Sequence, residues 1–185
     1  MNSCGSNVRS RFKGRKLSKL KMNSKNTRII SEDADKVKET SCGNLNKPQI
    51  FKVIDNLYMS GYQTAKNLDF LKQNKINHIV NLTSQSCENI HLNDLEYSSF
   101  KLSDNAQFNL SEILDNIIQV ISDQISQGKS VLVHCKMGIS RAPSIIIAYL
   151  IKIIGRTYNQ AFDEVQKIDP KISPNVGYLF QLESL

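Results

Sequence analysis

A strand–loop–helix segment is the feature that most constrains this chain. Residues 131–133 form an apolar run bounded by polar residues, which predicts a buried strand. Residues 145–151 are apolar almost without interruption, which predicts a helix buried on most sides. Cys135 and Arg141 lie in the short loop between them. A loop of this kind turns successive backbone N–H groups towards one point, and the helix N-terminus adds positive potential. The segment therefore predicts a nest for an anion.

The side chains of this loop suit nucleophilic chemistry on a phosphate ester. A cationic neighbour and a helix N-terminus favour the thiolate form of a cysteine, and the thiolate is the nucleophile. Arg141 offers a planar fork of donors that matches two oxygens of a phosphate group. We expect Ser140 to donate a hydrogen bond to the sulfur of Cys135, and Lys136 to add positive charge at the rim. A cysteine alone is usually a small buried residue, so the spacing carries this prediction.

The octapeptide HCKMGISR, residues 134–141, resembles the signature loop of the cysteine-dependent protein tyrosine phosphatases. The sequence that flanks it resembles that of the atypical dual-specificity phosphatases, and the resemblance extends over residues 48–185. It implies that Cys135 is the nucleophile, that Arg141 holds the phosphoryl oxygens, and that the reaction needs no metal or organic cofactor. It also implies a substrate cradle made by the backbone of the intervening residues, which are Lys136, Met137, Gly138, Ile139 and Ser140.

Asp104 is the predicted general acid and base. It lies in the segment LSDNAQFNLS, residues 102–111, between a predicted strand over 97–102 and a predicted helix over 113–125. The loops after this strand and after the strand over 130–135 would open at the same edge of a parallel sheet. A carboxyl group there can protonate a departing oxygen and later activate a water. The segment also resembles the acid loop of the same family, and Asp94 is the fallback candidate.

The other periodic segments complete an α/β domain with a mainly parallel central sheet and helices on both faces. Alternating residues predict a hairpin of strands over 50–54 and 57–59, followed by a helix over 64–73 and a central strand over 78–83. Thr157 is the predicted cap of the next helix, and Ser173-Pro174 the predicted start of the last. The apolar residues of this last helix are expected to pack on the core: Val176, Leu179, Phe180 and Leu182.

The positive charge of the chain is concentrated before residue 48. The 185 residues carry a formal net charge of +7, and residues 1–47 hold 12 of the 24 Lys and Arg but 4 of the 17 Asp and Glu. These residues show no sustained period, so we expect a disordered basic tail ahead of a catalytic domain over 48–185. The slightly acidic balance of that domain argues against binding of nucleic acid through it.

Several functions remain open for the tail. It could be a solubilising leader, a contact for an acidic partner or a membrane surface, a nuclear import signal, or a mitochondrial presequence. No apolar stretch of the sequence is long enough to cross a bilayer. The four cysteines show no paired spacing and no metal motif, which suits a reducing compartment. We expect a monomer in the cytoplasm, the nucleus or both, with the mitochondrion as the alternative.

Three residues carry open questions that the family resemblance raises. The residue after the signature arginine is usually Ser or Thr, and Ala142 in its place predicts a slower second chemical step. Asn81 either braces the phosphate loop, as in the family, or is an ordinary residue at a strand end. Cys87 either forms a reversible disulfide with Cys135 under oxidation, as in some relatives, or is an ordinary loop cysteine.

The resemblance implies a phosphatase that removes phosphate from tyrosine and from serine or threonine of phosphoproteins. The chain has no tryptophan, so it lacks the WPD-type acid loop of the large tyrosine phosphatases. Phosphoinositide phosphatases and RNA 5′-triphosphatases are alternatives. Their signature loops usually carry a further basic residue, whereas Lys136 is the single basic residue between Cys135 and Arg141. A phosphoprotein-binding module without activity is the remaining alternative, although it would not need Cys135, Asp104 and Arg141 together.

Overall fold

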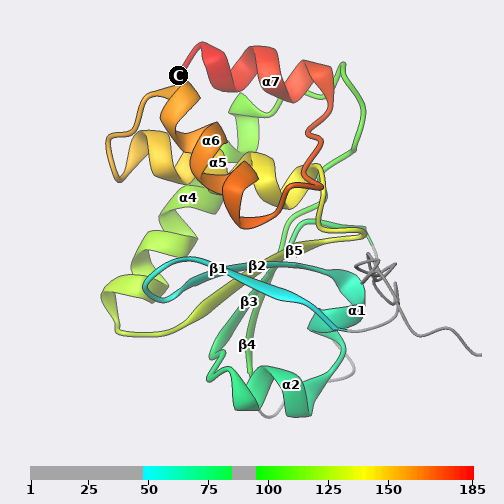
Figure 1. Ribbon diagram of the computed structural model, residues 1–185, viewed down its shortest axis with the longest axis vertical. Helices are drawn as coiled ribbons and strands as arrows, with labels where there is room; N and C mark the ends of the chain where they lie inside the picture. Colours follow the sequence, from blue (N-terminus) through cyan, green and yellow to red (C-terminus); the bar gives the residue numbers. More distant parts are fainter. Residues whose placement is uncertain (1–47, 85–94) are drawn as a thin grey trace, which may run out of the picture. The chain divides into compact units, whose positions relative to one another are not determined.

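The computed structural model describes residues 48–84 and 95–185, which Figure 1 shows as a coloured ribbon. The predicted tail over residues 1–47, Cys87 and Asp94 lie outside these ranges. The strands are β1 (Ile50–Ile54), β2 (Leu57–Gly61), β3 (His78–Asn81), β4 (Glu96–Ser99) and β5 (Val131–Cys135). The helices are α1 (Tyr62–Ala65), α2 (Leu68–Gln73), α4 (Ser111–Ser126), α5 (Arg141–Lys152), α6 (Tyr158–Ile168) and α7 (Val176–Glu183).

The five strands form one sheet in the order β1-β2-β5-β3-β4. The hairpin of β1 and β2 is antiparallel, and Asn56 in its turn has a φ of 62°. All other neighbouring strands are parallel, which confirms the predicted mainly parallel sheet. β5 lies between β2 and β3, and its last residue, Cys135, is in register with Gly61 at the end of β2. The carboxyl ends of these strands thus meet at one edge, where ligands of open α/β sheets bind.

Helices cover both faces of the sheet, as predicted (Figure 1). Side chains alternate along β5, so Val131, Val133 and Cys135 enter a large core shared with α4, α5, α6 and α7. Leu132 points the other way, into a smaller core with residues of α1 and α2. α5 runs through the large core, and all its residues from Ala142 to Leu150 are buried. The apolar run after the loop is therefore the buried helix that the sequence predicts.

The predicted helix over 64–73 is wrong in one respect, because the structure divides it into α1 and α2. Asn67 lies between them in an extended conformation and accepts a hydrogen bond from the backbone N–H of Phe70 at 3.0 Å. Asparagine is a strong N-cap, so it begins a new helix in place of continuing the first. The predicted cap at Thr157 is confirmed, because Thr157 and Gln160 form a capping box at the start of α6.

The predicted strand over 97–102 is shorter and ends at Ser99. Its partner β3 ends at Asn81, whose carbonyl accepts a last hydrogen bond from the N–H of Phe100 at 2.8 Å. Beyond that bond no strand among the described residues pairs with this segment, which continues in an irregular conformation until α4 begins. We name residues 100–110 the acid loop, because they contain the predicted general acid.

The last helix also differs from its prediction. Asn175 caps α7, two residues after the Ser173 that the sequence favours, and the helix begins at Val176. Tyr178 and Leu182 are buried, whereas Val176 is 56% exposed and Phe180 is 69% exposed. The prediction that all the apolar residues of this helix pack on the core is thus wrong for these two. They lie about half a turn from the buried pair, so α7 cannot bury both sets.

Candidate active site

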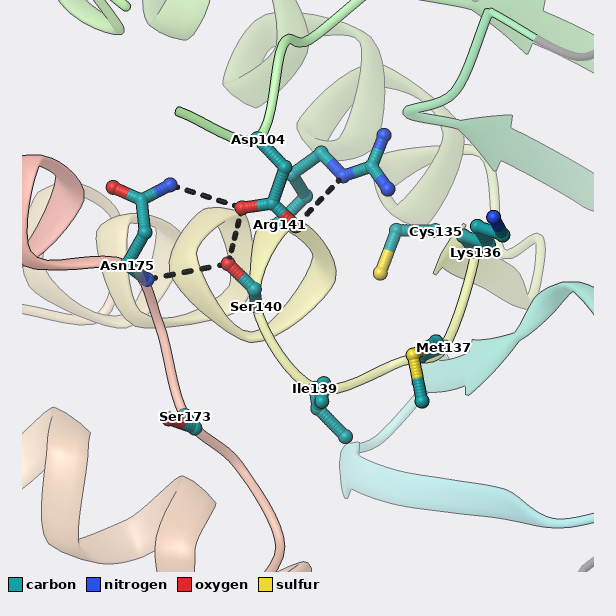
Figure 2. A pocket seen from close by; sticks show the side chains of 9 residues that line it. All are labelled: Asp104, Cys135, Lys136, Met137, Ile139, Ser140, Arg141, Ser173 and Asn175. Carbon is teal, nitrogen blue, oxygen red and sulfur yellow. Dashed lines mark hydrogen bonds and ion pairs between the residues drawn. The ribbon is translucent and has the colours of Figure 1, made fainter. Parts of the chain in front are cut away.

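The loop between β5 and α5 wraps around the sulfur of Cys135. We call residues 135–141 the phosphate loop. Cys135 is 2% exposed, and the backbone N–H of Gly138 donates to its Sγ at 3.2 Å. Figure 2 shows the sulfur inside the curve of the loop, with the side chains of Lys136 and Met137 along its rim. Met137 is 70% exposed, so the rim is open to a large ligand.

Neighbouring backbone holds two carbonyl groups of this loop away from its centre. The carbonyl of Lys136 accepts a hydrogen bond from the N–H of Tyr62 at 3.1 Å. The carbonyl of Ile139 accepts one from the N–H of Ser173 at 2.6 Å. In a trans peptide the C=O and the following N–H point in opposite directions, so the N–H groups of Met137 and Ser140 face away from those contacts. The loop therefore has the geometry of an anion nest.

Gly138 is needed for this conformation. Its φ is +82°, and a Cβ there would lie 2.9 Å from the backbone N of Gly61 and from the carbonyl carbon of Ser60. Both the backbone angle and the space at the end of β2 exclude a side chain. The loop thus lies directly on β2, which is a neighbour in the sheet but distant in the sequence.

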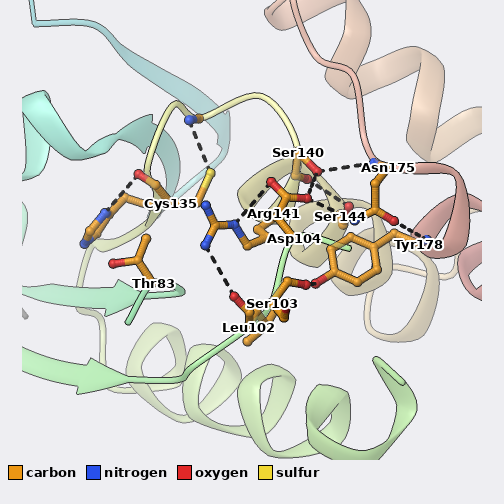
Figure 3. Close-up of polar contacts among 12 residues, drawn as sticks. Thr83, Leu102, Ser103, Asp104, Cys135, Ser140, Arg141, Ser144, Asn175 and Tyr178 are labelled. Carbon is orange, nitrogen blue, oxygen red and sulfur yellow. Dashed lines mark hydrogen bonds and ion pairs between the residues drawn. The ribbon is translucent and has the colours of Figure 1, made fainter. Parts of the chain in front are cut away.

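Arg141 is the first residue of α5, and its side chain is 13% exposed. Its Nη1 donates to the carbonyl of Leu102 at 3.3 Å. Its Nε lies 3.4 Å from Oδ2 of Asp104, an ion pair that lacks hydrogen-bond geometry. Figure 3 shows the guanidinium group between the acid loop and Cys135. The guanidinium can therefore interact with an anion above the sulfur while its stem stays packed.

Asp104 reaches the same pocket from the acid loop. Its Oδ1 accepts two hydrogen bonds, from Oγ of Ser140 at 2.6 Å and from Nδ2 of Asn175 at 3.0 Å. The structure thus brings together the three predicted catalytic residues, Asp104, Cys135 and Arg141. They line a pocket of about 350 Å³ with Lys136, Met137, Ile139, Ser140, Ser173 and Asn175.

The predicted hydrogen bond from Ser140 to the sulfur is wrong. Its hydroxyl donates to the carboxylate of Asp104, and it accepts from the backbone N–H of Asn175 at 3.2 Å. A carboxylate is a stronger acceptor than sulfur, and the N–H of Gly138 occupies the sulfur. Ser140 therefore links the two loops.

Sequence reasoning missed the part that the segment before α7 plays in this pocket. Ser173 and Asn175 line it, and Tyr178 donates from its hydroxyl to the carbonyl of Ser103 at 2.6 Å. Burial, together with the charge of Asp104, raises the pKa of Tyr178 above its ordinary value, so the phenol stays a donor. The phrase SPNVGYLFQL resembles a family segment, but its capping residues indicated only a helix start.

Two residues next to the phosphate loop have defined surroundings. His134 is fully buried on the opposite face of β5, and burial, aided by Arg141, lowers its pKa to about 4. The ring is therefore neutral at physiological pH. Asn81 is in register with His134, and its Oδ1 accepts from the N–H and the hydroxyl of Thr83 at 2.8 and 2.9 Å. A role for Asn81 in bracing the phosphate loop stays a prediction.

Comparison with known proteins shows which family this chain resembles. The family model described as "Dual specificity phosphatase, catalytic domain" matches residues 57–185. Protein phosphatase Slingshot of Drosophila melanogaster is 35% identical over 133 residues, which are 72% of this chain and 13% of that protein. Dual specificity protein phosphatase 1 of Arabidopsis thaliana is 35% identical over 140 residues, which are 76% of this chain and 69% of that protein.

Solved structures agree with this fold. The crystal structure of DUSP15 has 29% sequence identity and a TM-score of 0.69, and the match covers 73% of this chain and 85% of that one. The human tyrosine phosphatase-like serine/threonine/tyrosine-interacting protein has 27% identity and a TM-score of 0.67, over 75% of this chain and 95% of that one. The chain thus spans a small part of Slingshot and most of the smaller relatives. It belongs to the dual specificity phosphatases, a family of cysteine-based protein phosphatases.

Proposed function

We propose that this chain hydrolyses phosphate monoesters on tyrosine and on serine or threonine of proteins, through a phosphocysteine at Cys135. The observation that carries the proposal is the convergence of three groups in one pocket. Cys135 lies inside a loop with the geometry of an anion nest, Arg141 ends that loop at the start of α5, and Asp104 reaches the same pocket from the acid loop. Nucleophile, phosphate anchor and proton carrier are the groups that two-step phosphomonoester hydrolysis requires.

In the first step the thiolate of Cys135 attacks phosphorus. An S–P bond forms and the P–O bond to the alcohol breaks. Asp104, in its protonated form, gives its proton to the departing oxygen, so that a neutral alcohol or phenol leaves. The fork of Arg141 and the N–H groups of the phosphate loop hold the phosphoryl oxygens while charge moves across them.

In the second step a water attacks the phosphocysteine. Asp104, now a carboxylate, takes a proton from that water as the new O–P bond forms. The S–P bond breaks, and inorganic phosphate and the thiolate are released. The same carboxyl group serves both steps, so the protein returns to its starting state without another proton donor.

The ion pair between Arg141 and Asp104 supports a change of partner during this cycle. In the free protein Nε of Arg141 lies 3.4 Å from Oδ2 of Asp104. A phosphate dianion in the nest attracts the guanidinium more strongly than one carboxylate does. Release from the guanidinium leaves Oδ2 of Asp104 available to exchange a proton with the leaving group.

We also propose phosphoproteins as the substrates and the basic segment over residues 1–47 as a contact for an acidic partner or membrane surface. The open rim at Lys136 and Met137 supports a protein substrate, because a large ligand can reach the loop. We further propose that the protein is a monomer and that it is located in the cytoplasm, the nucleus or both. Sedimentation of the full chain and imaging of a tagged chain in cells test these two points.

A phosphoprotein-binding module is the second candidate, because the fold is shared with a protein described as tyrosine phosphatase-like. The complete set of Cys135, Asp104 and Arg141 supports the enzyme instead.

The deciding experiment is hydrolysis of para-nitrophenyl phosphate with EDTA present, for the wild type and for Cys135→Ser. We expect turnover by the wild type and a loss of at least about a thousandfold in the mutant, because oxygen replaces the nucleophilic sulfur. A folded wild type without turnover would overturn the proposal and favour the binding module. Peptides with phosphotyrosine, phosphothreonine and phosphoserine, and a phosphoinositide panel, then define the substrate class.

A further inference from the structure

Asn175 lies where three parts of the site meet. It is the N-cap of α7, it lines the pocket, and it contacts both the acid loop and the phosphate loop. Its side-chain Nδ2 donates to Oδ1 of Asp104 at 3.0 Å, and its backbone N–H donates to Oγ of Ser140 at 3.2 Å. Figure 2 shows these two contacts converging from one side of the pocket.

The helix cap fixes the orientation of this side chain. Oδ1 of Asn175 accepts a hydrogen bond from the backbone N–H of Tyr178 at 3.0 Å. Because the amide oxygen is used by this donor, the NH₂ group has to point towards Asp104. The reversed amide would set its oxygen against the carboxylate and its NH₂ against an N–H, losing both bonds. The N-cap role of Asn175 therefore fixes its amide in the one orientation that directs the NH₂ group to Asp104.

The backbone of Asn175 orients a second donor. Its N–H occupies the oxygen of Ser140, so the hydroxyl proton of Ser140 is directed to Asp104, 2.6 Å away. Oδ1 of Asp104 thus accepts two hydrogen bonds that both depend on Asn175. The other oxygen, Oδ2, faces Arg141.

The cap itself is held rigidly against the acid loop. A Cβ on Gly177 would lie 1.9 Å from the carbonyl oxygen of Ala106, so α7 contacts this loop backbone to backbone. Gln181 accepts from the N–H of Leu110 at 2.7 Å and donates to the carbonyl of Phe108 at 2.9 Å. These contacts fix the distance between the cap of α7 and the acid loop.

We propose that Asn175 is a positioning residue for the general acid. It holds Oδ1 of Asp104, so that Oδ2 is the oxygen that carries the proton to the leaving group and later takes one from water. The ionisable groups near this carboxyl group are Arg141, which forms the ion pair, Cys135 and Lys136, which line the same pocket, and Tyr178 of α7, on which the charge of Asp104 acts. This inference rests on the proposed function, because it assigns a role within the same two-step reaction.

The test compares two substrates that need the acid to different degrees. Phenyl phosphate has a poor leaving group and needs protonation, whereas 2,4-dinitrophenyl phosphate has a good leaving group and does not. The quantity to measure is the ratio of kcat/KM for the two substrates, which reports the steps up to departure of the leaving group. The variant is Asn175→Ser, which keeps an N-cap side chain but loses the donor to Asp104.

We expect Asn175→Ser to lower the phenyl phosphate to dinitrophenyl phosphate ratio about tenfold, and Asp104→Asn to lower it about a hundredfold or more. In the Asp104→Asn background, Asn175→Ser should change the ratio no further, because the residue acts through the acid.

The matched control is Asn67→Ser, which makes the same change at the N-cap of α2, away from the pocket. It should leave the ratio unchanged, and melting curves of both serine variants show the cost of the cap alone. Equal loss on both substrates in Asn175→Ser would overturn the positioning role and leave a structural one. An inactive wild type would instead overturn the proposed function, so the two failures are distinguishable.

Discussion

The phosphate loop and the acid loop reach one pocket by different routes. The phosphate loop is seven consecutive residues between a strand and the helix that follows it, and its conformation is tied to β2 by Gly138. The acid loop is irregular, and besides local turns it forms hydrogen bonds with residues far along the chain. Asp104 contacts Asn175, 71 positions later, and Ser103 contacts Tyr178, 75 positions later.

The two loops thus differ in how much of their conformation is set by consecutive residues. A strand, a glycine-containing turn and a helix N-terminus in succession favour an anion nest, and backbone contacts from Tyr62 and Ser173 also hold the phosphate loop. The acid is placed by docking of α7, which requires the whole core to form. We therefore expect changes near α7 to impair proton transfer while anion binding survives, and changes within the phosphate loop to impair both.

Among the changes that compare the two loops, the largest effect is expected for Gly138→Ala. The added Cβ would contact the backbone of β2 at 2.9 Å, in a conformation with a φ of +82°, so the loop has to shift. A displacement of about 1 Å at a catalytic group typically costs about a hundredfold in rate. We expect at least that loss in kcat/KM, together with loss of inhibition by orthovanadate, which occupies the nest.

Gly128→Ala is the control for this change. Gly128 has a φ of +76° and nothing within 4 Å of an added Cβ, so it shares the backbone strain without the collision. It should lose about 1 kcal/mol of unfolding free energy and keep its activity. Equal activity in the Gly138 and Gly128 variants would contradict the tight contact with β2.

The next effect is expected for Gly177→Ala, which pushes α7 away from Ala106 in the acid loop. Alanine in place of a helical glycine usually stabilises a protein by about 1 kcal/mol, so a lower melting temperature here would itself reveal the collision. We expect kcat/KM for phenyl phosphate to fall about tenfold or more, while inhibition by orthovanadate changes less than about threefold. Parallel loss of both would show that the two loops are not separable.

A pH effect on stability is expected at the strand that carries the phosphate loop. His134 has a folded pKa of about 4 against an ordinary value of 6.5, so the unfolded chain binds the extra proton between these values. Stability is complete above pH 6.5 and falls as the pH drops towards 4, by up to about 1.4 kcal/mol per pH unit. Urea unfolding between pH 7 and 5 measures the slope.

His134→Gln should reduce this slope, since the group that titrates is removed. His78, whose pKa burial also lowers, contributes with the same sign and lies at the start of β3, so His78→Gln is the matched variant. Hydrogen bonds from Lys129 and His78 lower the pKa of its neighbour Glu96. An unchanged slope in His134→Gln would show that His134 is not the buried neutral base.

The smallest effect is expected for Ala142→Ser. Ala142 follows Arg141 in the first turn of α5 and is fully buried. A serine hydroxyl there could donate to the departing sulfur in the second step, and one such hydrogen bond is worth about 1 kcal/mol, or about fivefold in rate. We expect a pre-steady-state burst in the wild type and a faster steady state in the mutant. Absence of both would refute a slow second step.

Predictions from sequence succeeded where the pattern depends on neighbours. The hairpin turn at Asn56, the capping box at Thr157 and the buried run of α5 each follow from side chains within a few residues. The helix over 64–73 failed for a local reason, the cap at Asn67, whereas two other predictions failed because of distant partners. β4 ends at Ser99 because β3 ends, and Ser140 turns from the sulfur because Asp104 and Asn175 lie beside it.

The family, the mainly parallel sheet, and the order of Cys135 and Arg141 around a glycine turn can be read from the sequence, because short-range geometry and apolar periodicity suffice for these. How Asp104 is held, and by which residues, becomes visible only in the folded protein. The partners of this aspartate are Ser140 and Arg141 at the start of α5 and Asn175 at the start of α7, and these lie together only when the core has formed. Consecutive residues thus supply the groups of the phosphate loop, and long-range packing positions the acid beside it.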